Sequence, residues 1–168
     1  MVRLIEFWIE LLGWIGALLL LPLTGAMIYE VGSRYLLNAP TFWAYELSYM
    51  MMGTIFLFGI AYALRHRAHV RVDLFYTGYS PRKKAVVDLF GYSLLLPCVL
   101  WLTWALYDYA VRAYTGHELS GQSAWNPPIW PYRVVYVIGM ASFSLQILAE
   151  VLKDLTTLVH GLRSNEVI

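Results

Sequence analysis

The sequence predicts an all-α membrane protein with four transmembrane helices. Of its 168 residues, 60% are hydrophobic and only 14% are charged, whereas soluble domains carry about 25% charged residues. Four long stretches of the chain contain almost no charge. A hydrocarbon core of roughly 30 Å needs about 20 apolar residues in a helix. A helix is favoured over a strand because a lone span must satisfy its own backbone hydrogen bonds.

An uncharged run predicts the first span, which we expect over residues 11–36. A cleaved signal peptide explains the run less well, because the run is long and no clear A-x-A site follows it. Arg3, Glu6 and Glu10 precede the run and predict a short interfacial lead-in. Gly13, with an alanine four residues later, predicts close contact with a neighbouring helix.

The second span is expected over residues 43–65 and the third over residues 82–113. Gly59, again with an alanine four residues later, predicts another close helix contact. A serine followed by Pro81 opens the third helix, since serine caps helix N-termini and proline suits the first helical position. Pro97 lies inside the third span and predicts a kink there.

The fourth span is expected over residues 129–157, with Arg133 near its start. Asn126, Pro127 and Pro128 precede it and predict an ordered turn, because prolines do not fit a helix interior. Tryptophans anchor helices at membrane surfaces, and five of them fall near the expected span ends: Trp8, Trp14, Trp43, Trp125 and Trp130. The whole chain, residues 1–168, is expected to form one transmembrane domain.

The basic residues predict the orientation. Six of them lie between the uncharged runs of the second and third spans, at the facing ends of these spans and in the loop that joins them: Arg65, Arg67, Arg71, Arg82, Lys83 and Lys84. The positive-inside rule places such a loop in the cytoplasm. With an even number of spans, both termini are then expected to be cytoplasmic.

No pattern in the chain predicts an enzyme. Cys98 is the only cysteine, which excludes an internal disulfide and paired-thiol chemistry. Phosphate loops, nucleophile elbows and HExxH motifs are missing from the sequence. Histidines lie outside the spans, which argues against haem inside the bundle, and His66 with His69 is too sparse for a metal site. No cofactor is expected, and the net charge of +1 gives no attraction to nucleic acid.

Three charged residues gather at the expected outer ends of the first two spans: Glu30, Arg34 and Glu46. Glu30 and Arg34 are four apart, in the favourable order for an ion pair on a helix. An interfacial salt bridge is the simpler interpretation, since charge costs little at that depth. The alternative makes Arg34 or Glu46 a docking or pathway residue. Gln146, inside the fourth span, is expected to meet a polar partner.

Three segments share their pattern with one known family. Residues 63–73, ALRHRAHVRVD, are similar to the segment after that family's second helix. Residues 42–47, FWAYEL, with Arg34 upstream, resemble its first outer loop. Residues 123–131, SAWNPPIWP, resemble the segment before its fourth helix. Nearly the whole chain therefore resembles the DctQ-like small permease subunits of tripartite ATP-independent periplasmic (TRAP) transporters; Arg67 departs from the pattern, where a small residue is common.

The resemblance implies a three-part importer in the bacterial inner (cytoplasmic) membrane. A periplasmic substrate-binding protein captures a solute, often an organic acid, and a large M-type permease subunit carries it by a sodium-coupled elevator motion. This chain would be a static scaffold for the large subunit and would help to dock the binding protein, among membrane lipids. None of its residues is implied as a substrate ligand. The residues implied in partner contacts are Arg34, Glu46, His69, Arg71, Asp73, Trp125, Asn126, Pro127 and Arg133.

Two other functions stay open on the sequence. A small stand-alone exporter could dimerise and use Glu30 as its proton-coupling acid, provided that Glu30 faced a water-filled cavity near the midplane. The chain could instead be the membrane anchor of an oxidoreductase, which haem or quinone in the purified protein would reveal. The sequence names neither a transported substrate nor a stoichiometry.

Overall fold

A computed structural model describes residues 2–66 and 81–163 of the chain. The helices of these residues are α1 (Val2–Leu18), α2 (Leu20–Leu36), α3 (Ala44–Arg65), α5 (Pro81–Thr115) and α6 (Trp130–Arg163). Four stretches are long and apolar enough to cross a membrane: Val2–Leu36, Ala44–Arg65, Val86–Thr115 and Trp130–Thr156. The all-α, four-span prediction is confirmed. The limits of each span in the bilayer and the side on which the termini lie stay predictions.

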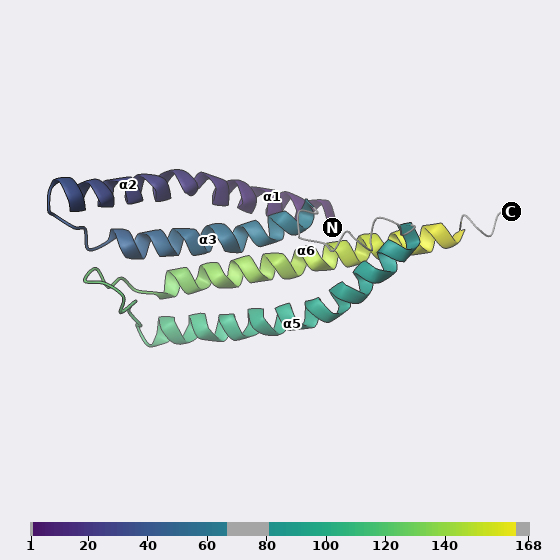
Figure 1. Cartoon of the computed structure of the whole chain (residues 1–168). Coiled ribbons are helices and arrows are strands. Elements are labelled where there is room, and N and C mark those ends of the chain that lie inside the picture. The colour runs from purple at the N-terminus through teal and green to yellow at the C-terminus, as the bar shows by residue number, and fades with distance from the viewer. Residues whose placement is uncertain (1, 67–80, 164–168) are drawn as a thin grey trace.

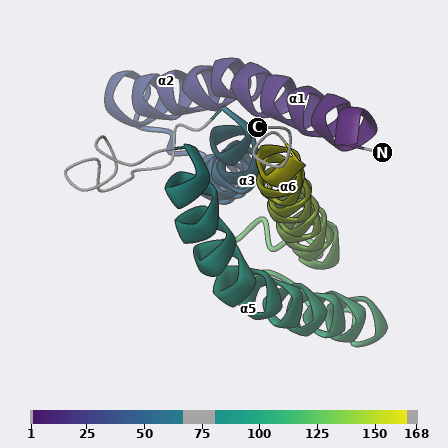
Figure 2. The same ribbon diagram turned by 90° about the vertical axis from the view of Figure 1, so that its right-hand side faces the viewer.

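The helices stand side by side in one layer, in the order α1–α2, α3, α6, α5 (Figure 1). The connections 37–43 and 116–129 lie at one end of the layer, which we call the loop end. The opposite end, which holds the N-terminus and the start of α5, we call the terminal end. Viewed from the terminal end, α1–α2 and α5 lie on opposite sides of the α3–α6 pair (Figure 2).

α1 and α2 form one long helix that is interrupted at Leu19. Backbone bonding continues through the interruption: the Leu19 N–H donates to the Ile15 carbonyl at 3.0 Å, and the Leu23 N–H to the Leu19 carbonyl at 3.1 Å. Pro22 has no N–H, so the Leu18 carbonyl loses its helical partner and the proline ring crowds it. Proline therefore bends this span without unwinding it.

The residues before Leu11 are those expected to form an interfacial lead-in, and their depth in the bilayer stays a prediction. They belong to α1, which packs against α3 and α6 and buries Ile9 completely. Gly13 lies so close to the Tyr62 ring of α3 that a Cβ would overlap it, which confirms the predicted small-residue contact. Gly59 has open space around it within the described residues, so the second predicted contact is not made there.

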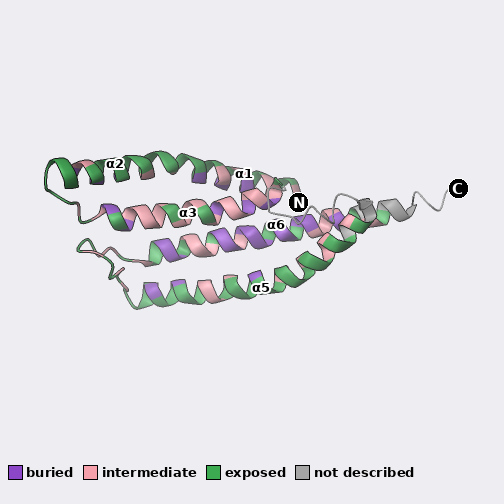
Figure 3. Cartoon of the chain, viewed as in Figure 1, coloured by how far each residue is buried: buried purple, intermediate pink, exposed green. Residues whose placement is uncertain are grey.

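α6 is the most covered helix, because it contacts α1, α3 and α5. Figure 3 shows its buried residues along the length of the layer, while the outer helices expose long apolar faces. Such faces suit lipid, whose tails are as apolar as leucine. α5 begins at Pro81, as expected, and stays helical through Pro97 with a curved axis (Figure 1).

Candidate functional site

The expected ion pair between Glu30 and Arg34 forms at the loop end. Oε1 of Glu30 accepts hydrogen bonds from Nε of Arg34, at 2.9 Å, and from Nη2. Oε2 accepts from the Thr41 backbone N–H, also at 2.9 Å, and from the Thr41 hydroxyl. The Glu30 side chain is only 10% exposed, whereas that of Arg34 is 56% exposed. The carboxylate thus ties α2 to the connection before α3 and holds the guanidinium at the surface.

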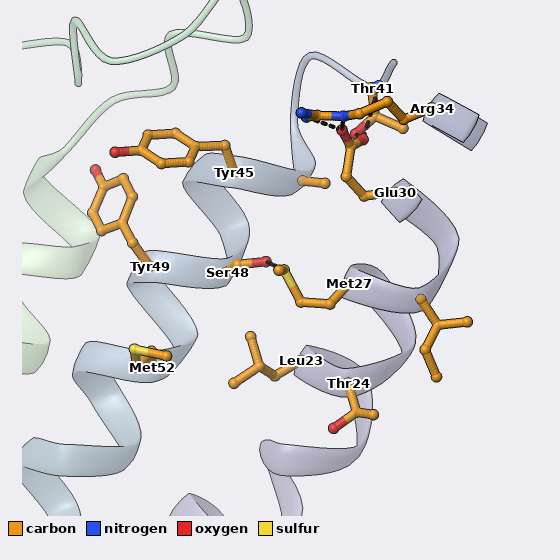
Figure 4. Close-up of a pocket in the computed structure, with 12 residues that line it drawn as sticks. Leu23, Thr24, Met27, Glu30, Arg34, Thr41, Tyr45, Ser48, Tyr49 and Met52 are labelled. Atoms are coloured by element: carbon orange, nitrogen blue, oxygen red, sulfur yellow. Dashed lines mark hydrogen bonds and ion pairs between the residues drawn. The ribbon is translucent and has the colours of Figure 1, made fainter. Parts of the chain in front are cut away.

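A groove of about 520 Å³ opens between α2 and α3 beside this pair. Figure 4 shows Glu30, Arg34 and Thr41 at its loop end and Leu23 and Met52 deeper in the layer. The groove is therefore charged at one end and apolar along its depth. Its other lining residues are Thr24, Met27, Ile28, Ala44, Tyr45, Ser48 and Tyr49.

Glu46 lies apart from this groove. Its side chain is fully buried in the first turn of α3, and neither carboxylate oxygen has a hydrogen-bond partner among the described residues. Gly53 lies seven residues further along α3, hence on the same face, and Tyr132 of α6 covers it. Glu46 therefore faces α6. The three charges that the sequence groups together occupy two places, Glu30 with Arg34 in the groove and Glu46 between helices.

The connection of residues 116–129 contains the expected turn. Asn126 adopts a left-handed backbone conformation, with φ of 45°, which asparagine tolerates better than most residues. Its Oδ1 accepts a hydrogen bond from the Gly121 N–H at 2.7 Å. The Pro127 carbonyl accepts from the Ser120 N–H at 2.9 Å. These bonds give the connection one defined shape.

Arg133 fastens this connection to the helices. Its Nη1 lies 2.7 Å from Oε2 of Glu118 and donates to the Tyr109 carbonyl of α5 at 3.2 Å. The guanidinium carbon also lies 3.4 Å from the centre of the Tyr109 ring, a cation–π arrangement. Trp125 is 41% exposed on the connection itself. Arg133 thus acts within the chain, while Trp125 is open to a partner or to lipid.

A polar network at the terminal end joins α1 to α6. Nζ of Lys153 lies 2.6 Å from Oε1 of Glu6 and 2.8 Å from Oε1 of Glu150. Nε2 of Gln146 donates to the same Glu150 oxygen at 2.8 Å, which confirms the polar partner expected for Gln146. The sequence interpretation missed the network, although the spacing of Gln146, Glu150 and Lys153 places them on one helix face.

α3 is tied to α1 in a similar way. Nη1 of Arg65 donates to the Glu6 carbonyl at 2.5 Å and forms an ion pair with Glu10. Nε2 of His66 lies 3.3 Å from the same Glu10 carboxylate. The acids expected in an interfacial lead-in are therefore partners of α3 and α6.

Three of the implied contact residues, His69, Arg71 and Asp73, lie outside the described residues. Their predicted roles in partner contacts stay predictions. Among residues 2–66 and 81–163, no group of three or more His, Cys, Asp or Glu side chains is placed to hold a metal ion.

One family profile matches the chain over residues 23–157; its description reads "Tripartite ATP-independent periplasmic transporters, DctQ component". The chain belongs to the DctQ family. DctQ proteins are transporter components rather than enzymes. With four apolar helices, this DctQ chain is a multi-pass inner-membrane protein, and its family membership confirms the resemblance to small TRAP permease subunits. The match takes in most of α2, all of α3 and α5, and most of α6, so α1 precedes it.

Two relatives agree with this family. The sialic acid TRAP transporter permease protein SiaT of Haemophilus influenzae is 29% identical over 87 residues, which are 51% of this chain and 14% of that protein. The sialic acid TRAP transporter small permease protein SiaQ of Vibrio cholerae is 32% identical over 57 residues, 34% of this chain and 33% of that protein. The DctQ chain thus spans a third or less of the length of either relative in these matches.

Proposed function

We propose that this small permease subunit is a static scaffold for a large M-type permease subunit. The two would work with a periplasmic binding protein in the sodium-coupled import of an organic acid or related small solute. Both relatives are named for sialic acid, which carries a carboxylate and fits this solute class. The scaffold role is the conclusion that the chain's own residues support best.

One observation carries the scaffold role: the middle of each span is uncharged. The stretches 11–29, 47–64, 89–107 and 134–149 contain no Asp, Glu, Lys or Arg. Pathways for ions and charged solutes need polar or ionisable groups near the midplane. Transporters that build such sites themselves commonly break helices around them, whereas the Leu19 and Leu23 N–H groups keep their helical bonds at the interruption of the first span. The transport path is therefore expected in the partner subunit.

The layer is also built to resist deformation. Lys153 with Glu6 joins its first and fourth spans at the terminal end. Arg133 with Tyr109 joins the third and fourth spans at the loop end. A carrier domain that moves across the membrane needs a support that does not move with it, and a broad layer fastened at both ends meets that need.

In this proposal the loop end faces the periplasm and the terminal end faces the cytoplasm, following the positive-inside rule. The ordered turn at Asn126 and Pro127, with the exposed Trp125 beside it, would then face the binding protein. His69, Arg71 and Asp73 would contact the large subunit on the cytoplasmic side.

Co-purification tests the proposal. The tagged chain is expressed with its neighbouring genes and extracted in mild detergent, and its partners are identified by mass spectrometry. A large, many-span membrane protein in a fixed ratio is expected. A homodimer alone that moves solute in liposomes, and loses that activity on Glu30→Gln, would contradict the proposal and favour the exporter. Bound haem or quinone would instead favour the oxidoreductase anchor.

A further inference from the structure

We propose that the groove between α2 and α3 binds one glycerophospholipid, with the phosphate at Arg34 and an acyl chain between the two helices. This inference requires only that the helices cross a bilayer. It holds for either direction of insertion and for any transported solute, so it goes beyond the proposed scaffold role.

The groove has the polarity of a phospholipid. Its charged end holds Arg34 and Glu30, and its depth is lined by Leu23 and Met52 (Figure 4). Its volume of about 520 Å³ lies within the range of roughly 300–1,000 Å³ that is usual for ligand pockets. A groove with this gradient, open to hydrocarbon along its side, matches the change from headgroup to acyl chain across a leaflet.

Aromatic residues mark the depth of the charged end. The rings of Tyr29 and Trp43 stack with their centroids 6.0 Å apart and their planes at 23°. Tyrosine and tryptophan gather at the level of the lipid headgroups. Tyr29 directly precedes Glu30, and Trp43 directly precedes Ala44, which lines the groove. Arg34 therefore lies at the depth where phospholipid phosphates lie.

Arg34 keeps hydrogen-bond donors for a phosphate. A guanidinium carries five N–H donors, and Glu30 accepts from Nε and Nη2 of Arg34. The side chain is 56% exposed, and arginine binds phosphate through directed, charge-assisted bonds. Because Glu30 offsets the charge, these bonds rather than net charge carry the affinity. Phosphatidylethanolamine and phosphatidylglycerol are therefore expected to bind about equally.

The apolar walls can adapt to an acyl chain. Met27 of α2 and Met52 of α3 both line the groove, and methionine side chains adjust to irregular surfaces. The Ser48 hydroxyl contacts Sδ of Met27 at 3.1 Å, so the two helices meet across the groove.

Native mass spectrometry of the full chain, purified in mild detergent and titrated with either phospholipid, tests the headgroup site. Arg34→Gln is expected to raise the dissociation constant of the 1:1 lipid complex about tenfold, the effect of losing a charged hydrogen bond. Arg112→Gln is the matched control. Arg112 also pairs with an acid four residues away, Asp108 at 2.6 Å, but does not line the groove.

The acyl-chain site is tested with tryptophan substitutions. Met52→Trp fills the groove and is expected to lower lipid binding, whereas Phe56→Trp, on the same exposed face one turn away, is expected to leave it unchanged. Equal binding by the wild type, Arg34→Gln and Met52→Trp would overturn the proposal. Equal losses of lipid binding in the controls Arg112→Gln and Phe56→Trp would also overturn it. A co-purified large subunit that occupies the groove in place of lipid would do the same. The readout requires neither transport nor a partner, so its failure is distinct from failure of the scaffold proposal.

Discussion

Tyr132 of α6 lies directly against the Cα of Gly53 in α3, and its hydroxyl donates to the Tyr49 carbonyl at 3.3 Å. A Cβ at residue 53 would overlap that hydroxyl, so the contact depends on glycine. Leu57 of α3 and Gly139 of α6 repeat the arrangement further along. Small residues of this kind let membrane helices pack closely. The two central helices of the layer are thereby held in one register.

Replacing Gly53 by alanine is therefore expected to destabilise the chain by about 1–3 kcal/mol, the usual effect of overpacking. The measurement is the midpoint of thermal unfolding in mild detergent. Gly59→Ala is the matched control on the same helix, because its Cβ meets open space. That variant is expected to equal or exceed the wild type, since alanine favours helix over glycine.

The double variant Gly53→Ala/Tyr132→Phe tests whether steric overlap between the added Cβ and the Tyr132 hydroxyl causes the loss of stability. Removing the Tyr132 hydroxyl removes the nearest clashing atom, which leaves the ring carbon Cζ 3.1 Å from the added Cβ. The double variant is expected to regain most of the lost stability. If it stays as unstable as Gly53→Ala, the contact does not set the spacing of α3 and α6.

The sequence predicts the spans well because a bilayer imposes one strong rule on each helix separately. Uncharged runs mark the helices, and the i,i+4 spacing of Glu30 and Arg34 predicts their ion pair. Contacts between different helices are harder to predict from the sequence. The residues around Glu46 do not reveal that its side chain faces α6, because that depends on the rotation of α3 about its own axis relative to α6. Lys153 and Glu6 are nearly the whole chain apart, so their contact requires α1 and α6 to be adjacent.

The network around Lys153 predicts a large effect at the terminal end. Lys153→Met leaves Glu150, whose side chain is 4% exposed, without its cation. Breaking a buried ion pair costs about 3–5 kcal/mol; because Lys153 is 35% exposed, we expect about 2 kcal/mol. Thermal unfolding again measures the change.

Two comparisons make that prediction specific. Adding Glu150→Gln to Lys153→Met removes the uncompensated charge and is expected to restore part of the stability. Arg112→Met breaks an exposed pair with Asp108 and is expected to cost less than about 1 kcal/mol. Equal losses for Lys153→Met and Arg112→Met would show that the network does not hold α1 against α6.

Arg133 is predicted to hold residues 116–129 in place. Arg133→Met removes both the Glu118 ion pair and the Tyr109 contact. The backbone N–H groups of Ser120 and Ile129 bond within this connection, so their hydrogen exchange is expected to become about tenfold faster. Arg112→Met serves as the control. Unchanged exchange in Arg133→Met would mean that the turn at Asn126 is sufficient by itself.

The proposed orientation predicts which face can be labelled from outside. In a Cys98→Ala background, Gln122→Cys places a thiol in the 116–129 connection and Lys83→Cys places one near the start of α5. An impermeant maleimide applied to intact spheroplasts is expected to label the first and to reach the second only after permeabilisation. The reverse pattern would place the termini in the periplasm.

The central claim is that this chain supports transport without containing the transport path. The most direct measurement is solute uptake, driven by a sodium gradient, in proteoliposomes that contain this chain alone or this chain with the large subunit, with binding protein present outside. We expect no uptake by the chain alone, and uptake that requires both membrane subunits. Sodium-driven uptake by this chain alone would contradict the account.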